Sequence, residues 1–181
     1  QKLFMFLSRG FTPKINLFYK KAQLISSIAL SLSHGENDAQ KSMGIITMLL
    51  VTYGFQTEFK VPFWVMFSCA LAIGLGTAFG GWKIIKTIGS GIYKLRPIHG
   101  FSSQTAGTFV ILTAAVLGGP VSTTHVISSS IMGVGSADRI KAVRWHKIKE
   151  IITTWIITIP ASALVAGIAY YIIIFIKNLI T

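Results

Sequence analysis

The chain alternates long apolar segments with short polar ones, and the apolar segments have the length of membrane-spanning helices. Residues 61–82 carry no charged side chain, and their length suits one bilayer crossing, which takes about 20 residues. Residues 22–55 and 151–176 are largely apolar over longer stretches. The pattern predicts three helical spans, over residues 22–55, 61–82 and 151–176.

A further apolar segment, residues 100–135, predicts a hairpin. The sequence GGP at residues 118–120 stops a helix, and Ser122 and the threonines after it can cap a second one. The limb after this stop is too short to cross a bilayer comfortably at about 1.5 Å per residue. Non-helical backbone at membrane depth is tolerated only where protein or water surrounds it. The link is therefore expected to line a cavity.

Polar residues also interrupt the first span, at SHGENDAQKSMG, residues 33–44. Gly35 permits an unwound turn, and Asn37 or Asp38 can cap a half-helix that starts after them. The N-terminus of a half-helix has free N–H groups and carries about half a positive charge. Two such termini, one here and one in the hairpin, predict an anion site inside the membrane, as in many secondary transporters.

The composition favours a membrane protein. Apolar residues make up 52% of the chain and charged residues 12%, with a mean hydropathy of +0.65. Soluble domains contain about 25% charged residues. The single cysteine cannot form an internal disulfide or a Cys-rich metal site, and the four histidines lack metal-ligand spacing. No metal and no cofactor are expected.

The net charge of +12 is distributed in clusters. No aromatic-interleaved basic patch accompanies them, so nucleic-acid binding is not expected. Basic loops remain in the cytoplasm. This places a basic segment, residues 1–21, and both ends of the hairpin in the cytoplasm. The membrane domain comprises residues 22–181, and its C-terminus is expected outside. The clusters are Lys2, Arg9, Lys14, Lys20 and Lys21; Lys83, Lys86, Lys94 and Arg96; and Arg139, Lys141, Arg144, Lys147 and Lys149.

Two motifs resemble those of a known family. HGENDAQKSMG is similar to the signature of the PiT family of inorganic phosphate transporters, a G-x-N-D turn in a broken helix, and GGPVSTTHVISSS to that family's S-T-T-H turn of a re-entrant hairpin. The variant of the first motif that has Gln40, Lys41 and Gly44 after the aspartate most resembles that of the bacterial branch, the low-affinity phosphate symporters. The resemblance implies a multi-pass protein of the bacterial cell membrane.

The resemblance also implies a fold. It is an all-α integral membrane protein with a broken transmembrane helix and a re-entrant helical hairpin. The family carries each motif twice, in inverted repeats, whereas this chain carries each once. The chain, which starts at Gln1 without an initiating Met, is therefore expected to be the C-terminal half of such a transporter. Its expected partners are an N-terminal repeat half, membrane lipid and phosphate.

The resemblance implies a phosphate site next to a coupling-ion site. Because phosphate is anionic, a carboxylate beside it requires a proton or a cation, which offers a means of coupling. H⁺ is favoured over Na⁺ because of the bacterial branch. The residues implied for the coupling ion are Asn37 and Asp38. The residues implied for phosphate are Ser122, Thr123, Thr124, Asp38 and Gln40.

Several alternatives stay open. Glu36 and Lys41 could form an ion pair, act in gating or contact the ligand. Ser122 and His125 could suggest a nucleophile and its base, but no third, orienting acid accompanies them, so an enzyme is not expected. An anion channel or a structural membrane subunit is the alternative to a symporter, and the carboxylate of Asp38 favours the symporter. The spacing of Gly76 and Gly80 is compatible with a homodimer.

Overall fold

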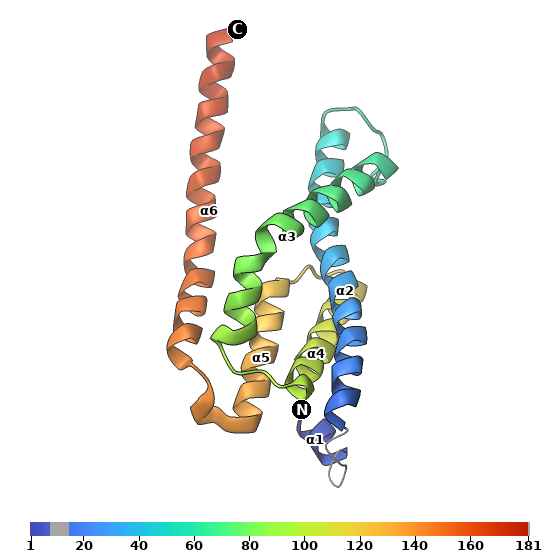
Figure 1. Cartoon of the computed structure of the whole chain (residues 1–181). Coiled ribbons are helices and arrows are strands. Elements are labelled where there is room, and N and C mark those ends of the chain that lie inside the picture. Colours follow the sequence, from blue (N-terminus) through green and yellow to red (C-terminus); the bar gives the residue numbers. More distant parts are fainter. Residues whose placement is uncertain (8–14, 181) are drawn as a thin grey trace. The chain divides into compact units, whose positions relative to one another are not determined.

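A computed structural model describes residues 1–7 and 15–180 of the chain, and in this part every regular element is a helix (Figure 1). The all-α fold class is confirmed. Arg9 and Lys14 of the predicted basic segment lie outside the described residues. The chain divides into two units, Gln1–Val143 and Arg144–Thr181. The elements are α1 (Lys2–Leu7), α2 (Ile15–Thr52), α3 (Phe63–Gly91), α4 (Pro97–Val116), α5 (Thr123–Arg139), the 3-10 turn η1 (Ile140–Ala142) and α6 (Trp145–Ile180).

The prediction of a broken helix at residues 33–44 is wrong. Helix α2 continues without interruption from Ile15 to Thr52, and the glycines with positive φ in the described residues are Gly54 and Gly118, not Gly35. A single glycine inside a helix costs about 1 kcal/mol relative to alanine. That is too little to unwind the helix when the polar side chains of this stretch find partners on other elements, as they do here.

The predicted hairpin is formed by α4 and α5, which pack against each other. Helix α4 ends in a Schellman turn, in which the Gly119 N–H donates to the carbonyl of Ala114 at 2.9 Å and the Gly118 N–H to that of Ala115 at 3.1 Å. Gly118 adopts φ +72°, which glycine reaches without strain. Helix α5 then begins at Ser122, whose hydroxyl oxygen accepts the His125 N–H at 3.4 Å. Local sequence therefore fixes the link between the two helices, residues 117–122.

Helix α2 runs alongside α4 and holds the hairpin (Figure 1). The Ser26 hydroxyl donates to Gln104 Oε1 at 2.6 Å, and Leu30 packs over Gly107, where an added Cβ would lie 3.4 Å from Leu30 Cδ1. Ile111 of α4 is fully buried. The first unit thus presents the middle of α2 to the link between α4 and α5.

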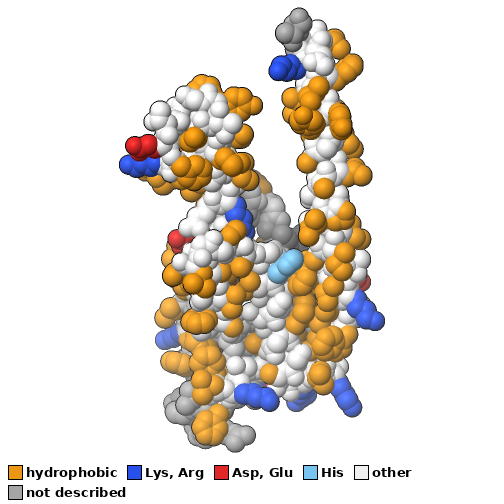
Figure 2. All heavy atoms as spheres, turned by 180° about the vertical axis from the view of Figure 1, so that it is seen from behind, with side chains coloured by type: hydrophobic (Ala, Val, Ile, Leu, Met, Phe, Trp, Pro, Cys, Tyr) orange, Lys and Arg blue, Asp and Glu red, His pale blue; other side chains and the backbone are white. Residues whose placement is uncertain are grey.

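Two segments of the described residues are long and apolar enough to cross a membrane, Phe63–Trp82 and Trp145–Leu179. They contain or overlap the predicted spans at residues 61–82 and 151–176. Side chains such as Phe79 are largely exposed, and Figure 2 shows hydrophobic side chains along the visible face of the long C-terminal helix. Apolar surface of this extent indicates contact with lipid or with other protein. The predicted span at residues 22–55 is not among these segments, because the middle of α2 is polar and charged.

Candidate functional site

Asn37 joins α2 to the backbone of the link. Its side chain is 2% exposed. The amide Nδ2 donates to the Val121 carbonyl at 2.9 Å, and Oδ1 accepts the Val121 N–H at 3.4 Å. Both backbone groups of Val121 lie outside a helix and need partners on another element. One asparagine therefore satisfies a whole peptide position and fixes the link against the middle of α2.

Asp38, the next residue, contacts side chains of both α2 and α5. Its Oδ1 accepts from Lys41 Nζ at 2.9 Å and from Asn37 Nδ2 at 3.1 Å. Its Oδ2 lies 3.4 Å from the hydroxyl of Thr123, which donates to it, and 3.4 Å from His34 Nδ1. The carboxylate is 32% exposed. It thus links α2 to the first residue of α5 and keeps access to its surroundings.

Lys41 pairs with Asp38, and not with Glu36 as one alternative had it. Its Nζ donates to Asp38 Oδ1 and, at 2.7 Å, to the Val121 carbonyl. Residues three apart share a helix face, whereas residues five apart lie about 140° around the helix from each other. Glu36 is exposed and its Oε1 accepts from Gln40 Nε2 at 3.5 Å. The helix geometry therefore selects the aspartate as the partner of the lysine.

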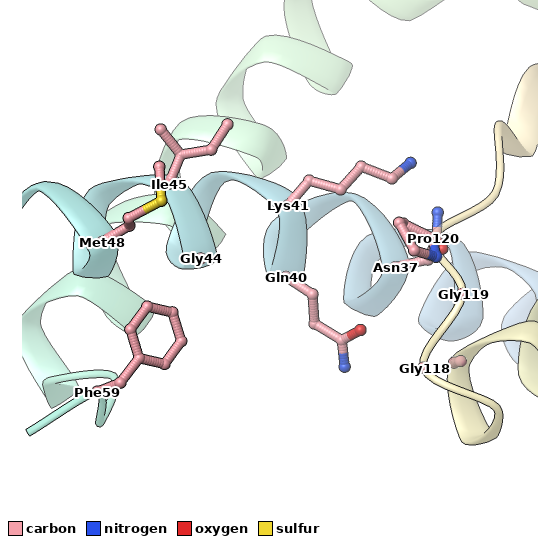
Figure 3. Close-up of a pocket in the computed structure, with 11 residues that line it drawn as sticks. Asn37, Gln40, Lys41, Gly44, Ile45, Met48, Phe59, Gly118, Gly119 and Pro120 are labelled. Carbon is pink, nitrogen blue, oxygen red and sulfur yellow. The ribbon is translucent and has the colours of Figure 1, made fainter.

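A cavity of about 360 Å³ opens beside these contacts (Figure 3). In Figure 3 Lys41 and Asn37 extend along α2 toward Pro120 of the link, and Phe59 lies on the opposite side of the view. The volume is in the range of small-molecule sites, about 300–1,000 Å³. The lining residues are Asn37, Gln40, Lys41, Gly44, Ile45, Met48, Phe59, Ala115, Gly118, Gly119 and Pro120.

The structure brings together only part of the predicted site. Asn37, Asp38 and Thr123 are in mutual contact, and Gln40 lines the cavity. Ser122 and Thr124 are exposed, and the Ser122 oxygen is used as the cap of α5. The carbonyl of Val121 was not foreseen, since nothing in the side chain of a valine signals it. The contact of Lys41 with Asp38 could have been foreseen from their spacing.

A second polar cluster lies at the opposite end of α5. Asp138 Oδ2 accepts from the Tyr93 hydroxyl and, at 2.9 Å, from the Arg96 guanidinium, and His99 Nε2 lies 3.5 Å away. Beneath it, Gly135 sits where an added Cβ would lie 3.0 Å from Tyr93 Cγ and from a methyl of Val143. His99 is fully buried and the Asp138 side chain is 10% exposed. This cluster ties the end of α5 to the start of α4.

The cluster alters the protonation of its members. The Tyr93 hydroxyl bonded to Asp138 lowers the pKa of that carboxyl below its ordinary value, and the Arg96 guanidinium acts in the same direction. The same hydrogen bond raises the pKa of Tyr93. Burial lowers the pKa of His99. The cluster is therefore held as a neutral tyrosine, a neutral histidine and a charged aspartate at neutral pH.

Comparison with known proteins bears on what the first cluster does. Residues 6–166 match the model of the phosphate transporter family. The chain is 50% identical over 161 residues to a probable low-affinity inorganic phosphate transporter of Bacillus subtilis, covering 88% of this chain and 48% of that protein. For a protein of the same description from Rhizobium meliloti the figures are 49% identity over 154 residues, 84% and 46%. The chain spans about half the length of these curated relatives.

A solved structure is also similar to this chain. It is described as the sodium-dependent phosphate transporter, and it matches with a TM-score of 0.71 and 30% sequence identity over 81% of this chain and 37% of that one. The likeness covers most of the helical arrangement described above.

Proposed function

Because the chain belongs to the phosphate transporter family, we propose that it forms one half of a cation-coupled symporter of inorganic phosphate. Proteins of this family are transporters and not enzymes, and they lie in a membrane. The observation that carries the proposal is the carboxylate of Asp38, held between α2 and the first residue of α5, with its partners Asn37 and Lys41 lining a cavity. Ionisable residues within a membrane are costly and mark substrate and ion pathways.

Phosphate binds, in this proposal, between the cavity, which Pro120 lines, and the N-terminus of α5, which begins three residues later. The first N–H groups of a helix have no partner within it and attract an anion. The Lys41 ammonium and the Gln40 amide line the same cavity and supply donors. The hydroxyls of the residues after the link complete the shell. The phosphate ligands we propose are Ser122, Thr123, Thr124, Gln40 and, at the edge of the site, Asp38.

Coupling follows from the repulsion between phosphate and Asp38. A carboxylate and an anion a few ångströms apart repel each other strongly in a low dielectric, so phosphate binds well only when Asp38 is neutralised. We place the coupling ion at Asn37 and Asp38 and favour H⁺ over Na⁺, on the resemblance of the motif to the bacterial branch. Asn37 bonds to the link and Asp38 to the first residue of α5, so binding of the coupling ion changes the surroundings of the proposed phosphate ligands.

The proposal includes a second half. The side chains of Asp38 and Lys41 are about one third exposed, 32% and 36%, and exposure to lipid at such a site would be costly. The chain spans 48% of one curated relative. We propose that an inverted N-terminal repeat covers this face and completes the ligand shell.

Uptake of radioactive phosphate into proteoliposomes tests the function. The complete transporter should accumulate phosphate under an inward proton gradient, and this chain reconstituted without its other half should not. Accumulation by this chain alone would contradict the half-site. Absence of uptake by the complete protein, with either an H⁺ or a Na⁺ gradient, would contradict phosphate symport.

Cysteine labelling tests the proposed topology. In a Cys69→Ala background, single cysteines at Ser90 and Lys141, which flank the hairpin, should react with an impermeant reagent only from the cytoplasmic face. Cysteines at Glu58 and Asn178 should react only from outside. Labelling of Ser90→Cys and Lys141→Cys from opposite faces would exclude a hairpin that opens to the cytoplasm.

A further inference from the structure

We propose that the Lys41 ammonium is a tethered cation that takes the place of an alkali coupling ion at Asp38, so that transport does not require Na⁺. The inference rests on the proposed function and deepens it, because it names the residue that sets the choice of coupling ion. The position of Nζ, 2.9 Å from Asp38 Oδ1 and 2.7 Å from the Val121 carbonyl, carries it.

The oxygens around Nζ are those that a hard cation would take. Carboxylate and carbonyl oxygens are the preferred ligands of such ions, and carbonyls of unwound segments hold coupling Na⁺ in many secondary transporters. Val121 lies in the link between α4 and α5, so its carbonyl is not part of a helical ladder. It accepts instead from Lys41 Nζ and Asn37 Nδ2. The ammonium therefore occupies the place between two cation ligands.

The local charge argues against a second cation there. Lys41 neutralises Asp38 at contact distance, and Glu36 accepts from the Gln40 amide and does not contact this pair. His34 faces the other oxygen of Asp38 and adds no negative charge. A Na⁺ ion between Asp38 and Val121 would meet the ammonium of Lys41 with no free carboxylate to offset it.

The tether keeps the ammonium at this place whenever Asp38 is ionised, so a proton that neutralises Asp38 releases it while Na⁺ has no place to bind. Lys41 is three residues after Asp38 on an unbroken helix, so the ammonium returns to the carboxylate whenever it leaves. Tethered groups have effective concentrations of about millimolar or more, and no bulk ion is needed to fill the place. An ammonium has three N–H donors. Two are used on Asp38 and Val121, and the third is available to an anion in the cavity that Lys41 lines.

The test uses the complete transporter in two readouts, phosphate uptake in proteoliposomes with NaCl or choline chloride, and the shift in Tm that NaCl causes in detergent. The parent should take up phosphate equally in both salts and show no Na⁺-specific shift in Tm. Lys41→Ala removes the tethered cation. Its apparent phosphate affinity in choline chloride should be about tenfold to hundredfold weaker, as for the loss of a charge-assisted hydrogen bond, and NaCl should restore part of it and raise Tm.

Two further variants serve as controls. Lys41→Gln keeps most of the side-chain volume and should respond to Na⁺ as the alanine variant does. Lys147→Ala breaks another lysine–carboxylate pair of the same spacing, with Glu150 on the exposed face of α6, and should leave uptake and the Na⁺ response unchanged.

Three results would overturn the inference: a parent whose uptake requires Na⁺, Lys41 variants whose Tm and uptake do not respond to Na⁺, or Lys41 variants that all fail to fold, which would make the lysine structural. Failure of the proposed function is separate, since a parent without phosphate uptake in any salt leaves the Na⁺-dependent shift in Tm as a measure of the cation site.

Discussion

Helix α5 is fastened at each end by an aspartate, and the two aspartates have different surroundings. Asp38 of α2 bonds to Thr123 at the N-terminal end of α5, and Asp138 near its C-terminal end bonds to Tyr93 and Arg96. The side chain of Asp138 is 10% exposed, whereas that of Asp38 is 32% exposed and its partners Asn37 and Lys41 line a cavity. Both carboxylates have hydrogen-bond partners, and we propose that Asp38, the more exposed one, is the one that exchanges a partner for a ligand.

The partners of the two aspartates differ in the same sense. Asp138 is held by a tyrosine and an arginine next to His99, which is fully buried. Asp38 is held by the flexible amine of Lys41 and by a long contact of 3.4 Å to Thr123. A partly exposed carboxylate whose neighbours line a cavity suits a binding role, and a nearly buried one suits the packing of α5. Substitutions at the two ends should therefore fail in different measurements.

The largest effect is expected for Asp38→Asn. The substitution keeps the size of the side chain and removes the charge that, in our proposal, balances the coupling cation or proton. Concentrative phosphate uptake should be abolished, while membrane insertion and Tm stay close to those of the parent. The matched control is Asp138→Asn. Accumulation by Asp38→Asn against a gradient as steep as the parent's would make this carboxylate structural.

A smaller effect is expected for Thr123→Val, which removes one hydroxyl and nearly keeps the shape. An unmade hydrogen bond in a binding shell costs about 1–3 kcal/mol, which corresponds to a roughly tenfold to hundredfold weaker apparent affinity. The variant should still accumulate phosphate at saturating concentration, so it separates affinity from coupling. The concentration dependence of uptake measures this, and Thr105→Val, whose hydroxyl donates to its own helix, is the control. An unchanged half-saturation would remove Thr123 from the phosphate shell.

At the other end of α5, Asp138→Asn should act on stability. The asparagine amide cannot neutralise Arg96, and where its Nδ2 replaces a carboxylate oxygen it cannot accept a hydrogen bond. The loss should be about 1–3 kcal/mol, the cost of an unsatisfied buried group, measured as a lower Tm in detergent and less protein in the membrane. The folded fraction should bind phosphate with the parent's affinity. A loss of affinity without a loss of Tm would mean that the two ends of α5 do not differ as described.

The same comparison shows how far the sequence could predict the site. The link between α4 and α5 was predictable because its causes are local, a glycine at φ +72° and the cap at Ser122. The state of α2 was not, because it depends on Val121, 84 residues from Asn37 along the chain. Because the polar side chains of α2 form hydrogen bonds with the link and with α5, the helix stays intact.

The cluster at Asp138 was not predicted at all. Its members are separated by up to 45 residues, the distance from Tyr93 to Asp138, and no motif joins them. In the sequence, Arg96 reads as part of a cytoplasmic basic group and His99 as an isolated histidine. Only the fold, which brings the start of α4 against the end of α5, places both residues next to Asp138.

The smallest effect is expected for Tyr93→Phe, and it depends on pH. The Tyr93 hydroxyl is the main cause of the lowered pKa of Asp138, so its loss should cost about 0.5–1.5 kcal/mol at neutral pH, the net value of a hydrogen bond. A carboxyl whose folded pKa is lowered stabilises the fold above its ordinary pKa of 3.8 and loses this contribution as pH falls through the lowered value. The difference in Tm between parent and variant should therefore be largest at neutral pH and disappear in strong acid.

The alkaline side should behave in the opposite sense. The pKa of Tyr93 is raised above 10.0, so the stability from its hydroxyl is present below that value and is lost as the phenol ionises. Buried His99, whose pKa is lowered, costs both proteins stability as pH falls below 6.5, since the unfolded chain binds the proton more readily. That loss is common to parent and variant and cancels in their difference. Tyr53→Phe, at a tyrosine that is 74% exposed, is the control. Equal Tm curves for the two phenylalanine variants would show that the hydroxyl of Tyr93 does not hold Asp138.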